Sequence, residues 1–112
     1  MADRLKVQKT TITNVAGATC MTGVSGDSQT VLSISICNTS ANDETFHMLH
    51  TASGGGSGYY IYHTQSLPAK STFIHNDKII LLASEELWIE SASDPDDTDG
   101  IHVVVSYLDQ DD

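Results

Sequence analysis

Alternation of apolar and polar residues is clearest in residues 31–40, VLSISICNTS. Leu32, Ile34 and Ile36 fall on one face of an extended strand, while serine and cysteine side chains fall on the other. A period of two is typical of a sheet with one buried side. The strand is followed by NTSAND, whose short polar side chains favour a turn. This pattern predicts an all-β protein.

The remaining patterns predict short strands along the whole chain and no helix of useful length. The segment SGGGSG at 53–58 favours a hairpin turn over a phosphate-binding loop, because a strand-like segment follows it. We expect one domain, residues 1–112, built as a single antiparallel β-sandwich or jelly roll of about seven to eight short strands. The expected strands cover residues 5–13, 30–37, 44–51, 59–63, 72–75, 79–83, 87–92 and 101–108, with a further short strand around 18–22.

Composition limits the class of protein. The chain has 112 residues, of which 39% are hydrophobic and 18% are charged, which is too apolar for a disordered chain. No apolar run approaches the roughly 18 residues that a membrane helix needs. The N-terminal segment MADRLKVQKTT has no apolar stretch behind its basic residues, so we expect no secretory signal peptide and folding in a cytoplasm.

The net charge of −10, from fifteen acidic and five basic residues, argues against nucleic acid and membranes as partners. The charges are unevenly distributed, because three of the five bases, Arg4, Lys6 and Lys9, lie in the first nine residues. We expect a basic N-terminal arm at 1–12 and an acidic tail at 109–112 that engage separate partners. The acidic residues near the end are Asp94, Asp96, Asp97, Asp99, Asp109, Asp111 and Asp112.

No metal or cofactor is predicted. His47 and His50 are three residues apart on one expected strand, so they point to opposite faces and cannot chelate together. The segment SDPDDTDG at 93–100 resembles a calcium loop, but aligning Gly100 with the sixth position puts Pro95 at the first ligand position. A looser cation site remains an alternative to a solvated loop; it would use Asp94, Asp96, Asp97 and Asp99.

Catalysis is not expected. The chain lacks a G-x-S-x-G elbow, and Cys20 and Cys37 have no recognisable local base. Their separation matches neither a zinc knuckle nor a redox pair. We expect two free, partly buried thiols in preference to a disulfide. Tyr60 and Tyr62 fall on one face of their strand and, with Trp88, are a candidate aromatic binding face. The alternative for these rings is ordinary cross-strand packing.

The order of these signals resembles small virion structural proteins of tailed bacteriophages. The resemblance covers about residues 29–110. The segments that carry it are the strand end VLSISICNTS, the segment YYIYHTQSLPAKST after the glycine hairpin, the two short strands in KIILLASEELWIESAS, and the terminal VVVSYLDQ. The first 28 residues depart from the usual form, because NVAGATCMTGVSGDSQ stands where a TVPAG-like turn is common.

The resemblance implies a capsid decoration or cement protein of the virion, assembled in the host cytoplasm, which binds the major capsid protein as a homo-oligomer, often a trimer. Arg4, Lys6 and Lys9 are then candidate contacts with the shell or a neighbouring copy. One alternative is a tail, neck or baseplate component. Another is a carbohydrate-binding module displayed on the virion, and a third, from a different class, is a small metalloenzyme.

Overall fold

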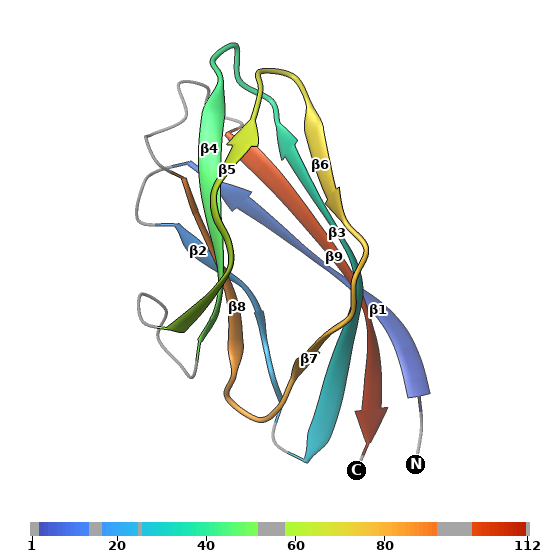
Figure 1. The fold of residues 1–112 in the computed structure, drawn as a ribbon. Coiled ribbons are helices and arrows are strands. Elements are labelled where there is room, and N and C mark those ends of the chain that lie inside the picture. The colour runs from blue at the N-terminus through green and yellow to red at the C-terminus, as the bar shows by residue number, and fades with distance from the viewer. Residues whose placement is uncertain (1–2, 14–16, 25, 52–57, 92–99, 112) are drawn as a thin grey trace.

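The computed structural model describes residues 3–13, 17–24, 26–51, 58–91 and 100–111. These residues form nine β-strands and no helix (Figure 1). The described part of the chain therefore contains no helix long and apolar enough to span a membrane. The strands are β1 (Asp3–Ile12), β2 (Ala18–Thr22), β3 (Asp27–Asn38), β4 (Glu44–Thr51), β5 (Gly58–Leu67), β6 (Thr72–His75), β7 (Ile79–Leu81), β8 (Glu86–Ser91) and β9 (Ile101–Asp111).

The strands build two antiparallel sheets that pack face to face, which confirms the predicted β-sandwich. The five-stranded sheet has the order β1-β9-β3-β6, and β7 also pairs with β3. The four-stranded sheet has the order β2-β8-β4-β5. Figure 1 shows the two layers, with both chain ends at the same end of the five-stranded sheet. The further short strand around 18–22 forms as β2, so the described residues contain nine strands where about seven to eight were expected.

The core lies between the two sheets, where their inward-facing apolar side chains meet. Phe46 is its largest fully buried side chain, and its ring contacts Tyr62 and Phe73 edge to face, at centroid distances of 6.1 and 5.4 Å. The other buried members of this cluster are Ile12, Cys20, Met21, Val31, Ile34, Ile36, Met48, Leu67, Leu81, Leu87, Ile89, Ile101, Val103 and Val105.

A β-bulge in β3 corrects one expected face assignment. The register with β9 shifts between Val31, which pairs with Tyr107, and Ser33, which pairs with Ser106. Leu32 is the additional residue at this bulge and is half-buried, whereas Val31 is fully buried with Ile34. Val31, not Leu32, therefore takes the inward position before Ile34, because a bulge reverses the faces of all residues on one side of it.

The turn after β3 forms as its polar residues predict. The Asn38 side-chain oxygen accepts hydrogen bonds from the backbone N–H of Ser40, at 3.0 Å, and from its hydroxyl, at 2.8 Å. The Asn38 amide donates to the carbonyl oxygens of Asn42 and Leu67, at 2.8 and 3.0 Å. Asn38 is fully buried, so this side chain joins the end of β3 to the end of β5 in the opposite sheet.

The hairpin between β4 and β5 is confirmed by its strand pairs, which run antiparallel from Glu44↔Leu67 to Thr51↔Gly58. The glycines at 53–57 lie outside the described residues. The candidate cation ligands Asp94, Asp96, Asp97 and Asp99 also lie outside them.

Candidate interaction surface

The expected basic arm is a strand of the five-stranded sheet. β1 pairs with β9 without interruption, from Asp3↔Gln110 to Ile12↔Ile101. Residues 3–9 are exposed on both faces of the strand, because the four-stranded sheet does not cover this part of β1. In the described part of the chain, β1 pairs only with β9, so it is an edge strand with one unpaired side.

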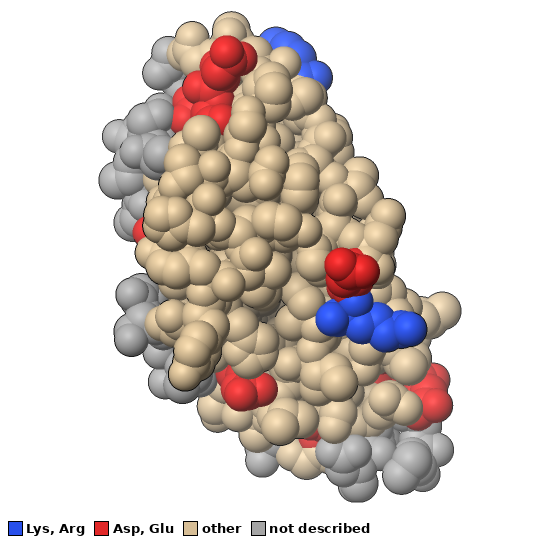
Figure 2. Space-filling model, viewed as in Figure 1, with Lys and Arg blue, Asp and Glu red and all other residues tan. Residues whose placement is uncertain are grey.

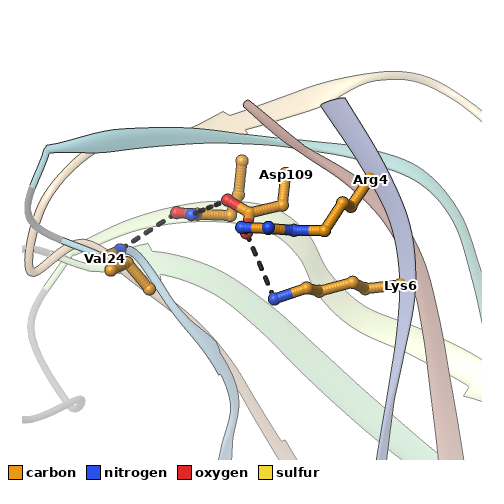
Figure 3. A network of polar contacts seen from close by, with 5 residues as sticks. Arg4, Lys6, Val24 and Asp109 are labelled. Atoms are coloured by element: carbon orange, nitrogen blue, oxygen red, sulfur yellow. Dashed lines mark hydrogen bonds and ion pairs between the residues drawn. The ribbon is translucent and has the colours of Figure 1, made fainter. Parts of the chain in front are cut away.

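Two of the bases on β1 are already engaged within the molecule. The Asp109 carboxylate contacts Lys6 Nζ at 3.2 Å and an Arg4 guanidinium nitrogen at 3.6 Å (Figure 3). Asp109 also accepts a hydrogen bond of 2.8 Å from the side-chain amide of Gln29. The Gln29 side-chain oxygen in turn accepts a bond of 3.0 Å from the backbone N–H of Val24, which fixes the orientation of the amide. This network joins β1, β3 and β9 to the loop after β2.

The network stabilises the charged form of Asp109. The hydrogen bond from Gln29 is the largest cause that lowers the pKa of this carboxyl, and Lys6 and Arg4 lower it further. Burial acts in the opposite direction, since the side chain is only 5% exposed. The sequence predicts Asp109 in an acidic tail, but it lies within β9, where it contacts both bases.

Lys9 differs from the other two bases. It is exposed and makes no ion pair with any described residue. Its pairing with Val104 places it with Leu5 and Val7 on the outer face of the sheet, whereas Arg4 and Lys6 point to the side that carries Asp109. The structure therefore does not bring Arg4, Lys6 and Lys9 together as one basic cluster.

An apolar hollow lies beside β1. Its volume is about 380 Å³, and the side chains of Leu5 and Val7 border it, with exposed fractions of 77% and 53%. Leu32, the residue at the bulge in β3, lines the other side. The remaining lining residues are Lys6, Ser106 and Tyr107.

The opposite edge of the same sheet also exposes apolar side chains. Ile74 of β6 pairs with Ser35, and Ile80 of β7 pairs with Thr30, so both isoleucines lie on the outer face. They are 50% and 57% exposed. In Figure 2, acidic and basic side chains stand at a few separate places, and a broad uncharged surface lies between them.

The expected aromatic face of Tyr60, Tyr62 and Trp88 does not form. β5 contains a second irregularity, since Met48 pairs with Tyr62 and the adjacent Leu49 with Tyr60. Tyr62 therefore points between the sheets, where its ring lies 5.0 Å from that of Phe73. For Tyr62 the packing interpretation is the correct one.

Tyr62 also closes the edge of the sandwich. Its hydroxyl forms a hydrogen bond of 2.7 Å with Nδ1 of His75, which joins β5 of one sheet to β6 of the other. His75 is 5% exposed, and its Nε2 has no hydrogen-bond partner in the described part of the chain. Burial is the largest cause that raises the pKa of Tyr62, and the charge of Asp77 raises it further.

Tyr60 and Trp88 lie on the outer face of the four-stranded sheet, on either side of Leu49. Tyr60 is 53% exposed, and its ring lies 4.5 Å from that of His63 and 5.5 Å from that of His47. Leu49 separates Tyr60 from Trp88 by one strand, so the two rings do not form a continuous platform.

The histidines do not form a metal site among the described residues, where no group of three or more potential ligands is found. His47 and His50 lie on opposite faces, as their spacing predicts. His47 contacts Tyr60 on the outer face, and its Nδ1 accepts a hydrogen bond of 2.9 Å from the backbone N–H of Thr64. His50 Nε2 instead lies 3.0 Å from the carbonyl oxygen of Ile80 in the other sheet.

Both cysteines are free, which agrees with the expected pair of thiols. Cys20 is buried between the sheets, and burial raises the pKa of its thiol to about 12, although hydrogen bonds with Thr10 and the backbone of Ile89 act in the opposite direction. Cys37 lies half-buried on β3.

Sequence reasoning missed Gln29 and Asp109 as the residues that organise β1. Gln29 lies in β3 at an inward position, where an apolar residue is the usual choice, and it is 1% exposed. A glutamine in phase with Val31 is a weak signal for a buried polar contact. The partner, 80 residues away, becomes identifiable only from the pairing of β3 with β9.

No protein-family model matches the chain, and a comparison with curated proteins finds no match. Among solved structures, the chain is similar to a protein of Bacillus endospore appendages, described as a family of disulfide-linked pili. The TM-score is 0.56 and the identity 11%, over 98% of this chain and 87% of that one.

A chain in the structure of infectious bursal disease virus, Gx strain, is also similar, with a TM-score of 0.50 and 14% identity over 95% of this chain. This chain spans 32% of the length of that viral chain. At these identities the likeness shows the fold alone. Neither neighbour is from a tailed bacteriophage, so the resemblance to that class of virion protein stays a prediction.

Proposed function

We propose that this chain is a structural protein of a bacteriophage virion and that it decorates the capsid by binding the major capsid protein. Its work is binding alone, without catalysis, metal or cofactor. In this proposal, many copies bind the shell, and their individually weak contacts add up through multivalency.

The observation that carries the proposal is the exposed apolar surface on the outer face of the five-stranded sheet. Leu5 and Val7 at one edge and Ile74 and Ile80 at the other are each at least half exposed. A folded chain of net charge −10 that keeps such side chains in water has a surface suited to a protein partner. The fold is also one that a pilus protein and a viral chain share, which agrees with a structural role.

Lys9 is the base best placed to contact the shell. It is exposed on the same outer face as Leu5 and Val7, and it has no acidic partner among the described residues. Arg4 and Lys6 contribute less, because Asp109 already binds both. The homotrimer implied by the resemblance remains a prediction of this proposal.

The experiment that tests the proposal is the copy number of this chain in purified virus particles, measured by quantitative mass spectrometry against the major capsid protein. Hundreds of copies in a simple ratio to the capsid subunits are expected. A few copies per particle would instead favour a tail, neck or baseplate component, and a complete absence from particles would contradict both roles.

A variant tests the surface itself. Ile80→Glu places a charge on the outer face of β7, and Val24→Glu places one in the loop after β2 at a site of similar exposure, 52% against 57%. Purified Ile80→Glu protein is expected to lose binding to particles that lack this chain, while Val24→Glu protein binds normally. Equal binding by both variants would exclude this face as the contact with the shell.

The alternative of a virion-displayed sugar-binding module is not favoured by the geometry. Its motivation was a face that Tyr60, Tyr62 and Trp88 share, and Tyr62 lies instead between the sheets.

A further inference from the structure

We propose that His47 is a pH sensor built into the four-stranded sheet: it holds a β-bulge in β5 while its ring is neutral and releases the bulge when the ring takes up a proton. In the described part of the chain, β5 is an edge strand of this sheet. The sensor lies on the outer face of the four-stranded sheet, away from the proposed contact with the shell, and does not rest on that function.

The first observation is the bulge itself. The register of β4 with β5 shifts between Phe46 and Met48, so that His47 alone stands opposite two residues of β5, His63 and Thr64. The backbone of Thr64 has a φ of 55°, in the left-handed region, which costs free energy for a β-branched residue. Backbone strain of this kind persists only while the surrounding contacts hold it.

The second observation is the contact that holds the bulge. The backbone N–H of Thr64 donates a hydrogen bond of 2.9 Å to Nδ1 of His47. Because Nδ1 accepts this bond, it carries a lone pair, and the proton of the neutral ring lies on Nε2. A second proton can therefore enter the ring only at Nδ1. Two N–H donors would then face each other, and the bond to Thr64 would be lost.

The titratable groups that face His47 come from the two strands beside β4. On β5, the ring of His63 lies 4.7 Å from that of His47, and the ring of Tyr60 lies 5.5 Å from it. On β8, Glu90 is the residue opposite His47 and lies on the same outer face. When His47 is protonated, the Glu90 carboxylate attracts its ring, and a protonated His63 repels it. Both interactions draw the charged ring away from its neutral position beside Thr64.

The consequence is a change of the sheet edge in mild acid. Histidine is the side chain whose charge ordinarily changes between about pH 5 and 8. Above this range the bond from Thr64 is present, and as the pH falls through it the bond is lost. The strain at Thr64 then favours a return to extended backbone. Because a bulge is one of the devices that protect an edge strand against further pairing, β5 loses this protection when the bulge is released.

NMR spectroscopy of the isotope-labelled full chain between about pH 8 and about pH 5 tests the proposal. Long-range proton–nitrogen correlations are expected to show His47 protonated on Nε2 alone at the upper pH and on both nitrogens at the lower pH. Over the same interval, the protection of the Thr64 amide against solvent exchange, relative to its intrinsic rate, is expected to fall by about tenfold, the effect of losing one hydrogen bond. The amide of Ile34, in the buried part of β3, is expected to stay protected.

His47→Asn removes the sensor and keeps the bond, because the asparagine side-chain oxygen accepts in place of Nδ1 and takes up no proton. In this variant the Thr64 amide is expected to be equally protected at both pH values. The matched control is His102→Asn, which replaces an exposed histidine of the other sheet and is expected to leave the pH dependence at Thr64 unchanged.

Three results would overturn the proposal. The first is a Thr64 amide whose protection in the wild type is the same at both pH values. The second is a His47→Asn protein whose Thr64 amide loses protection in acid as the wild type does. The third is a loss of protection at Ile34 together with Thr64, because acid would then unfold the whole domain and not release one bulge.

Discussion

The side-chain amide of Gln29 donates a 2.8 Å hydrogen bond to the carboxylate of Asp109, and both side chains are buried. This contact joins β3 to β9, and the other oxygen of Asp109 binds Lys6 and Arg4 of β1. One buried carboxylate thus holds three adjacent strands of the five-stranded sheet. The strength of this anchor is open to direct measurement.

We expect Asp109→Asn to lower the melting temperature markedly. The asparagine oxygen can still accept from Gln29, but the side chain then turns an N–H donor toward Lys6 and Arg4 and carries no charge. Asp77→Asn is the control, because Asp77 is exposed in the turn between β6 and β7, and its melting temperature is expected to stay near that of the wild type. Equal melting temperatures of the two variants would show that Asp109 is not an anchor.

The lowered pKa of the Asp109 carboxyl predicts that the stability of the folded protein depends on pH. Because the folded state lowers the pKa of Asp109 from 3.8, the stabilising contribution of this group is fully present above pH 3.8 and is lost as the pH falls through the lowered pKa. The difference in unfolding free energy between wild type and Asp109→Asn is therefore expected to be constant at neutral pH and to narrow in strong acid. Urea unfolding at a series of pH values measures this difference in unfolding free energy. A difference that widens in acid would contradict the stabilising role of the charged Asp109 carboxylate.

Tyr62→Phe is expected to destabilise the protein by about 1–2 kcal/mol, because it removes the hydrogen bond to Nδ1 of a buried His75 whose other ring nitrogen already has no described partner. Tyr59→Phe makes the same chemical change on a side chain that is 84% exposed, and its effect is expected to lie within about 0.5 kcal/mol of zero. Denaturant unfolding compares the two. If both variants unfold alike, the bond between Tyr62 and His75 does not stabilise the edge of the sandwich.

Phe46→Ala is expected to cost about 3–5 kcal/mol, since Phe46 is fully buried between Tyr62 and Phe73 and its loss leaves a cavity. Ile80→Ala serves as the control for an apolar truncation at a half-exposed site, with an expected effect below about 1 kcal/mol. Thermal or denaturant unfolding gives both values. A small loss for Phe46→Ala would mean that the core is not organised around this ring.

The two thiols are expected to differ in reactivity. Burial raises the pKa of Cys20 to about 12, so almost no thiolate is present at neutral pH, and the side chain is also inaccessible. Alkylation of the folded protein, followed by mass spectrometry, should modify Cys37 and spare Cys20, whereas both should react in denaturant. Cys37→Ser is then expected to resist alkylation in the folded state. Rapid modification of that variant would contradict the burial of Cys20.

The strand pattern follows from the sequence to a large extent. The ranges expected at 18–22, 44–51 and 72–75 agree with the strands of the structure, because alternation of side chains and turn-forming residues are local properties of the chain. The same local patterns indicated the packing of two sheets around one core. The candidate sites could not be predicted from these local patterns, because each site depends on contacts between residues that are distant in the sequence.

What the sequence by itself determined is therefore the all-β class, the approximate limits of most strands, and the acidic, charge-poor character of the chain. Only the tertiary structure decided which side chains face inward, because the bulges at Leu32 and in β5 reverse the alternation and depend on the partner strands. It also decided that Asp109 binds Arg4 and Lys6. That pairing arises because β9 lies between β1 and β3, and a period-two pattern contains no information on which strands become neighbours.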